Sequence, residues 1–376
     1  MDQTRLDQQL ASSAQDGDLA AVSTLLEQGA DPLFDESSAL RHAAFHGRAE
    51  CVNLLLPISN PKDQESFALR CAASNGHAEC VKRLIPFSAP DDFSSALRNA
   101  SFGGHVECVK LLISTCDPAS NFSLALRSAA GKGHAECVRL LLPFSEPRDK
   151  DSAALSAAAR GGHLECVELL IPVSDPKADC SAALQLAAEH GHQKCVELLI
   201  PLSDPRAEDS SAIVSAAANG HVECVKLLIP VSDASHDDSL ALRKAAGRGR
   251  ADCVRILIPV SEPKSAGSLA LRCAALGGHV DCAKLLIPSS DPLISNPLPF
   301  HAAIENGHAP MVAAMLDSEP LLIGLIDPAR LHLDAVKYEQ FELAELLFSI
   351  AERLALGDSL PSPSQSAQPS LRLARL

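Results

Sequence analysis

The chain has 376 residues, of which 47% are apolar but only 3% are aromatic, and none is Trp. This aromatic content is too low for one ordinary hydrophobic core of a chain of that size. A formal net charge of -15 argues against binding of nucleic acid or of an anionic membrane through the overall charge of the chain. No stretch approaches the ~18 uninterrupted apolar residues of a membrane-spanning helix. We therefore expect a soluble chain whose apolar residues are buried by something other than a single large globule.

The sequence contains an internal repeat with a period of about 29 residues, which explains how the apolar residues can be buried. The aligned glycines are Gly17, Gly47, Gly76, Gly104, Gly133, Gly162, Gly191, Gly220, Gly249, Gly278 and Gly307, and from Gly104 onward their spacing is constant. The sequence around these glycines is close to the consensus S-x-A-L-R-x-A-A-x-x-G-H-x-E-C-V-K-L-L-I-P-x-S-D-P. Such regular recurrence predicts stacked repeat units instead of independent domains.

Each unit reads as a helical hairpin. The Ser before A-L-R-x-A-A is expected to be an N-cap, and the Leu and Ala residues give a short first helix with a slim apolar face. The glycine should end that helix in the left-handed conformation. Cys, Val and Leu residues then mark a second helix, which a proline stops. A short connector, which we call the finger, leads to the next unit.

In chain order, four segments are expected. Residues 4–30 form an N-terminal capping repeat, and residues 31–317 form the main array. Residues 318–356, which contain F-E-L-A-E-L-L-F-S-I-A-E-R-L, form a degenerate C-terminal cap, and residues 357–376 form a disordered tail. One hairpin cannot bury enough surface to fold alone, so each unit depends on its neighbours.

The repeat resembles the ankyrin repeat. The run G-H-x-E-x-V-x-x-L-L matches the second helix of that family, and residues 299–303, P-F-H-A-A, echo its P-L-H-x-A motif. The resemblance implies an all-α, ankyrin-like solenoid of helical hairpins. Because the unit is shorter than the family's usual repeat of about 33 residues, we expect short fingers with little β-structure. Arg41 and Arg70 are among the positions where Arg replaces the family's His.

The cysteine column admits two interpretations. A Cys recurs in the second helix, three residues after a His or Arg, as at Cys80 and Cys108. His-x-x-Cys on a helix can present two metal ligands, and redox sensing is a further alternative. A small buried apolar residue is the expectation we favour, because the family places core residues in this column. The repeated His is expected to bridge the turns of neighbouring units.

Functional residues should lie where the repeat varies. The first variable column is the residue pair before each glycine, which the resemblance places toward the concave, partner-binding face. The second is the finger residue three positions before the Ala of S-x-A-L, where aromatics fall in adjacent units and acids in later ones. An exposed aromatic cluster is what a binding hot spot requires. The alternative is that Phe93 and Phe122 only cover the shortened fingers. The predicted partner-binding residues are Phe45, His46, Phe93, Phe102, Phe122, Lys132, Arg160, His190, Asp209, Asp238 and Arg248.

These features favour a non-enzymatic protein-binding module, monomeric and cytoplasmic, that holds a partner protein on its concave face. The acidic fingers predict a partner with basic side chains. No nucleic acid, membrane, cofactor, metal or catalytic residue is expected. Two alternatives stay open at this point: a bacterial effector that captures a host protein after delivery into a host cell, and a Cys/His metal-binding or redox-sensing protein.

Overall fold

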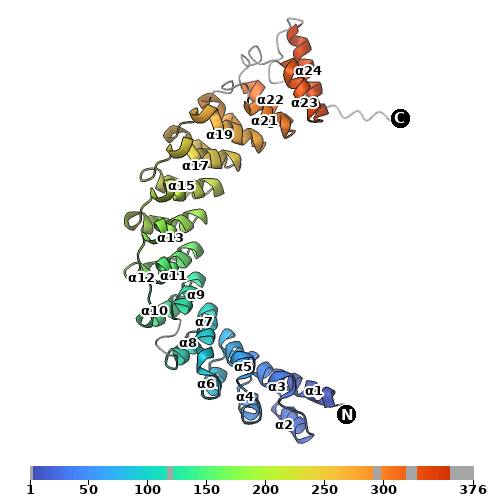
Figure 1. The fold of residues 1–376 in the computed structure, drawn as a ribbon, viewed down its shortest axis with the longest axis vertical. Coiled ribbons are helices and arrows are strands. Elements are labelled where there is room, and N and C mark those ends of the chain that lie inside the picture. The colour runs from blue at the N-terminus through green and yellow to red at the C-terminus, as the bar shows by residue number, and fades with distance from the viewer. Residues whose placement is uncertain (1–2, 117–121, 291–297, 319–327, 356–376) are drawn as a thin grey trace, which may run out of the picture. The chain divides into compact units, whose positions relative to one another are not determined.

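The computed structural model describes residues 3–116, 122–290, 298–318 and 328–355 (Figure 1). Within these ranges every regular element is a helix and there is no strand. The predicted all-α solenoid of helical hairpins is therefore confirmed for the described part of the chain, as is the expectation of fingers without β-structure. No helix in these ranges is both long and apolar enough to cross a membrane. The predicted tail, residues 357–376, lies outside the described residues.

The chain divides into two compact bodies, which we describe separately. The N-terminal body (Met1–Asp204) contains seven helical hairpins, of which the odd-numbered helices are the first helices and the even-numbered ones the second. Its helices are α1 (Gln3–Asp16), α2 (Leu19–Glu27), α3 (Phe34–Phe45), α4 (Ala49–Leu55), α5 (Asp63–Ser74), α6 (Ala78–Leu84), α7 (Phe93–Gly103), α8 (Val106–Ile113), α9 (Phe122–Lys132), α10 (Ala135–Leu141), α11 (Asp149–Gly161), α12 (Leu164–Leu170), α13 (Ala178–Glu189) and α14 (Gln193–Leu199).

The C-terminal body (Pro205–Leu376) repeats the same hairpin and ends in two less regular pairs. Its helices are α15 (Ala207–Asn219), α16 (Val222–Leu228), α17 (His236–Gly247), α18 (Ala251–Leu257), α19 (Ser265–Leu276), α20 (Val280–Leu286), α21 (Leu298–Glu305), α22 (Ala309–Ser318), α23 (Pro328–Lys337) and α24 (Phe341–Ala355). The run F-E-L-A-E-L-L-F-S-I-A-E-R-L of the expected C-terminal cap forms most of α24, which packs on α23.

Within each body, first helices pack on neighbouring first helices and second helices on neighbouring second helices. The shared apolar positions carry this packing. In the third unit, for example, Leu69, Ala72 and Val81 are fully buried, and Cys80 is 1% exposed. Burying one Leu contributes about 1.5–3 kcal/mol, while the Ala residues let adjacent first helices approach closely. The residues common to all units therefore build the stack.

A glycine and a histidine join neighbouring hairpins. Gly76 has a φ of +78°, and the backbone N–H of the next residue, His77, donates to Ala72 O at 2.9 Å, which closes the first helix as predicted. The His105 Nε2 of the following unit lies 2.9 Å from Ser74 O. A Cβ added to Gly76 would stand 2.5 Å from the Nδ1 of His105, so the glycine is also required for space. The same histidine bridge recurs in both bodies, at His134 and His308 among others, and confirms the predicted bridging role.

The fingers differ from the prediction. Ser66, expected to be an N-cap, caps no helix; it has a φ of +52° and its hydroxyl accepts the backbone N–H of Ala89 in the next unit at 3.0 Å. Gln64 and Glu65, which precede it, are also left-handed. Among the described fingers, such runs of three left-handed residues occur in six, and their central residues are Glu36, Glu65, Asp151, Cys180, Asp209 and Asp238. The N-cap expectation is therefore wrong, because the serine hydroxyl serves the neighbouring unit instead of its own helix.

Candidate functional site

The variable pairs before the glycines lie at the C-terminal ends of the first helices, and the predicted members are exposed. In the N-terminal body Phe45 is 47% exposed and Phe102 is 55% exposed. The other predicted members of this column are exposed as well: His46, Lys132, Arg160, His190 and, in the C-terminal body, Arg248. Large exposed aromatics are unusual in a chain with 3% aromatic residues, and they mark a surface that can contact a partner.

A groove runs over the first helices of the first three hairpins. One part, of about 280 Å³, is lined by Gln15 from α1, by Arg41, His42, Phe45 and His46 from α3, and by Phe67 from α5. A second part, of about 560 Å³, is lined by residues of α1 and α3 and shares Gln15 and His42 with the first. Helices α1, α3 and α5 lie side by side within this body (Figure 1). We call this surface the first-helix groove.

Phe67 forms the aromatic floor of the groove. The guanidinium carbons of Arg41 and Arg70 lie 5.8 Å and 5.5 Å from its ring centroid, within the range of cation–π attraction. Its side chain is half-buried. The ring of Phe45 packs edge-on against His46 at a centroid distance of 4.9 Å. The groove thus combines apolar ring surface with fixed cations.

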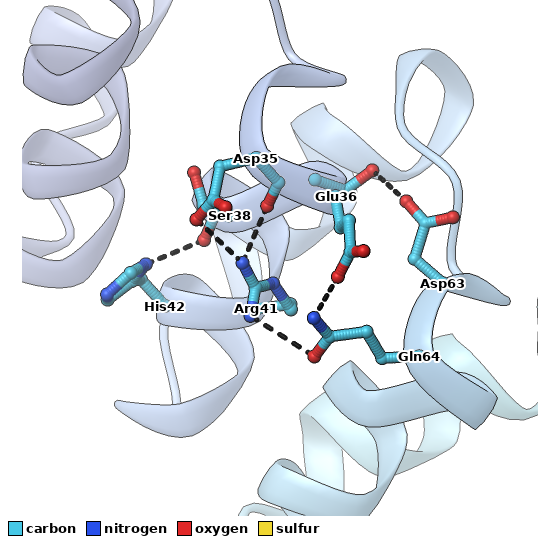
Figure 2. A network of polar contacts seen from close by, with 8 residues as sticks. Asp35, Glu36, Ser38, Arg41, His42, Asp63 and Gln64 are labelled. Carbon is cyan, nitrogen blue, oxygen red and sulfur yellow. Dashed lines mark hydrogen bonds and ion pairs between the residues drawn. The ribbon is translucent and has the colours of Figure 1, made fainter.

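The finger holds Arg41 in place. Its guanidinium donates to the backbone oxygen of Asp35 at 2.6 Å and to the Asp35 carboxylate at 3.0 Å, and it also donates to Gln64 (Figure 2). Arg70 repeats the backbone contact with Gln64 O at 2.8 Å. In Figure 2 the amide of Gln64 also donates to Glu36, which links two successive fingers. These bonds orient the guanidinium groups before any partner arrives.

A second aromatic–cation pair lies further along the same body. The Lys132 Nζ at the end of α9 stands 4.6 Å from the ring centroid of Phe102 at the end of α7. Both residues were predicted for the site, and the structure brings them together across neighbouring units. His190, from the same column, stacks on His192 with a centroid distance of 6.2 Å.

Phe93 is buried, contrary to the sequence prediction. It is 6% exposed, so the prediction of an exposed aromatic finger is wrong at this position and the alternative, that Phe93 covers the finger, describes it. Its φ is −63°, whereas its counterparts in six other fingers are left-handed. A bulky aromatic is strongly disfavoured at positive φ, so this unit starts its helix at Phe93. The side chain of Phe122 lies outside the described residues.

The acidic finger residues predicted for the site lie in the C-terminal body. Asp209 and Asp238 are both exposed. The Asp209 carboxylate lies 3.0 Å from the Nε2 of His236 in the next finger. Arg248, at the end of a first helix, donates to the Asn219 side chain at 3.1 Å.

Sequence reasoning missed two features. Phe67 occupies the variable position of S-x-A-L, where the other units carry Ser, Leu or Ala, and that lone aromatic was the available signal. A second exposed apolar row is formed by the residues that follow the proline after a second helix, in the units that carry this proline. Its exposed members in the N-terminal body are Ile58, Phe87, Phe144, Val173 and Leu202. We call this row the proline edge.

The cysteines of the column are buried thiols. Burial raises the pKa of the Cys108 thiol from its ordinary value of 9.0 to about 11, and the same cause acts on Cys80 and Cys137. These thiols therefore stay protonated at neutral pH, and the thiolate is the form that binds metals or reacts. In the part of the chain that the structure describes, no three His, Cys, Asp or Glu side chains gather as a metal site.

Comparison with known proteins agrees with the repeat. The family model for ankyrin repeats in three copies matches overlapping windows that together span residues 9–324. No curated protein sequence matches the chain. Among solved structures, the ankyrin repeat domain of human ASB11 is 24% identical over 47% of this chain and 96% of its own length, with a TM-score of 0.40. Because the family model matches most of the chain and the hairpins carry the family's glycine and histidine contacts, the chain belongs to the ankyrin repeat family.

Proposed function

We propose that this chain is a non-enzymatic binding protein that holds a partner protein on the first-helix face of its N-terminal body. Ankyrin repeats are in general protein–protein interaction modules. The observation that carries the proposal is the first-helix groove, where Phe45 and Phe67 lie beside the oriented guanidinium group of Arg41, and Arg70 lies against the same Phe67 ring. Aromatic and Arg side chains in one place are the usual composition of a binding hot spot.

The mechanism we propose is pre-organisation. The guanidinium of Arg41 is already fixed by Asp35, and histidine bridges such as the one from His77 to Phe45 O join neighbouring hairpins. Side chains that are ordered before binding lose less entropy when the partner docks. The exposed finger acids Asp209 and Asp238 belong to the C-terminal body and are not part of this proposed site.

The test is partner capture with two matched double variants. Phe45→Ala with Phe102→Ala removes the exposed aromatics of the first-helix face. Phe87→Ala with Phe144→Ala removes two phenylalanines of similar exposure, 51% and 55%, from the proline edge. We expect the first pair to reduce capture from a cytoplasmic extract by about tenfold or more, because truncating one hot-spot aromatic costs about 2 kcal/mol or more. The second pair should leave capture unchanged.

Circular dichroism melts of both variants give the control, because exposed residues should change the melting temperature little. If the proline-edge pair abolishes capture and the first-helix pair does not, the proposal is wrong about the face. If neither pair changes capture, the aromatics do not carry binding.

A further inference from the structure

We propose that the first-helix face of the N-terminal body binds an acidic segment of its partner protein, in which apolar side chains alternate with carboxylates. This inference rests on the proposed function and adds the chemical class of the partner. Charge is divided unequally among the elements of the repeat.

The first helices α3, α5, α7, α9 and α11 carry cations and no acids beyond their fingers. No Asp or Glu occurs in residues 37–48, 66–77, 93–105, 122–134 or 152–163. Outside the fingers, the Arg and Lys residues of these first helices are Arg41, Arg70, Arg98, Arg127, Lys132 and Arg160. The acids of the same units lie in the fingers and on the second helices. The first-helix face of these five units is therefore basic, although the chain carries a net charge of -15.

Three of these cations have no carboxylate partner among the described residues. Arg98 and Arg160 are exposed and Arg127 is half-buried. Among the residues that the structure describes, no carboxylate lies within ion-pair distance of any of the three. By contrast, Arg139 on the second helix α10 bonds Glu136 at 3.2 Å and Glu165 at 2.5 Å. Unneutralised positive charge thus remains on the first-helix face.

Aromatic rings are interleaved with these cations. Lys132 lies over the Phe102 ring, and Arg41 and Arg70 flank the Phe67 ring. A ligand that matches this face places carboxylates on Arg98, Arg127 and Arg160 and apolar side chains on Phe45 and Phe102. A peptide with both kinds of residue meets this requirement, and charge complementarity fixes its orientation.

A nucleic acid fits this surface less well. The fingers that border the basic face carry exposed acids such as Asp91 and Asp151. A continuous phosphate backbone binds by neutralising many charges over a long path, and these acids together with the net charge of -15 would repel it. Separate carboxylates on a peptide can reach the arginines between the fingers.

The experiment is a fluorescence anisotropy titration of the full chain with a fluorescein-labelled peptide of Glu-Glu-Phe repeats. The test variant reverses three charges on the first helices, with Arg98→Glu, Arg127→Glu and Arg160→Glu. The control variant makes the same change in net charge on the fingers, with Lys62→Glu, Arg148→Glu and Lys177→Glu. We expect the first triple to weaken binding by about tenfold or more and the second by less than about threefold. Raising the NaCl concentration should weaken binding of the unchanged chain.

Two further probes are a Lys-Lys-Phe peptide and a single-stranded RNA. Tighter binding of either probe than of the acidic peptide would overturn the inference, and so would equal losses in the two triple variants. If the first triple fails to fold, as judged by its melt, Arg98→Gln with Arg127→Gln and Arg160→Gln decides the question. If the peptide experiment contradicts the acidic ligand while the double variant Phe45→Ala with Phe102→Ala still loses partner capture, the acidic ligand is wrong and the proposed binding face is still supported.

Discussion

Phe67 shows how one variable residue turns a structural position into part of a site. Its neighbours in the chain, Ala68 and Leu69, are buried, while Phe67 itself stays half-buried beneath Arg41 and Arg70. The two arginines close the fingers by bonding backbone oxygens, as at Asp35 and Gln64. One guanidinium therefore serves both the fold and the surface.

At the same scale, the buried thiols predict a pH dependence of stability. The pKa of the Cys80, Cys108 and Cys137 thiols is raised to about 11 in the folded chain, from an ordinary value of 9.0. Between pH 9 and 11 the unfolded chain therefore loses protons that the folded chain keeps, so the free energy of unfolding falls as the pH rises. Below pH 9 this contribution is fully present.

The measurement is the melting temperature as a function of pH, for the unchanged chain and for Cys80→Ala with Cys108→Ala and Cys137→Ala. The variant should be less stable at neutral pH, because it loses buried volume, but its decline between about pH 9 and 11 should be shallower. Parallel declines would show that these thiols do not cause the effect.

At the scale of the element, the finger is where the fold departs from local preference. Three consecutive left-handed residues cost about 1–2 kcal/mol each relative to right-handed ones unless the side chain is Gly. In each of the six fingers that contain such a run, a Ser hydroxyl accepts a backbone N–H of the next unit, as Ser152 does from Asp175 at 2.9 Å, and these bonds hold the run. In three of the fingers the guanidinium of Arg41, Arg70 or Arg243 also donates to a backbone oxygen of the run. None of these six runs contains a glycine, the residue that normally indicates a left-handed backbone conformation. For this reason the sequence predicted an ordinary N-cap.

Replacing a left-handed finger residue with glycine should therefore stabilise the chain. Asp151 has a φ of +55°, and Asp151→Gly is expected to raise the free energy of unfolding by about 0.5 kcal/mol, since relief of backbone strain exceeds the added entropy of the unfolded chain. Phe93→Gly is the contrasting variant: its φ is −63° and its ring is buried, so a loss of about 3–5 kcal/mol is expected. Urea unfolding measures both, and a destabilising Asp151→Gly would contradict the strained finger.

At the scale of the molecule, the constant positions of the repeat were enough to predict the hairpins, the glycine turns, the buried cysteines and the histidine bridges. Each of these depends on contacts that recur once in every unit and can be recognised by periodicity. The exposure of Phe45, Phe102 and Lys132 could be predicted because these residues vary within a recognisable column, whereas the half-buried Phe67 beside them could not, since it lies in a different column. Phe93 was misplaced because sequence spacing does not show whether a finger residue is left-handed.

The central claim is that the varied residues of the first helices, and not the proline edge, contact the partner. Hydroxyl-radical footprinting of the captured complex tests it in one measurement, because exposed phenylalanines of the N-terminal body lie on both surfaces. We predict that oxidation of Phe45, Phe67 and Phe102 falls in the complex while oxidation of Phe87 and Phe144 does not change. Protection of Phe87 and Phe144 with continued oxidation of Phe45 and Phe102 would contradict the account.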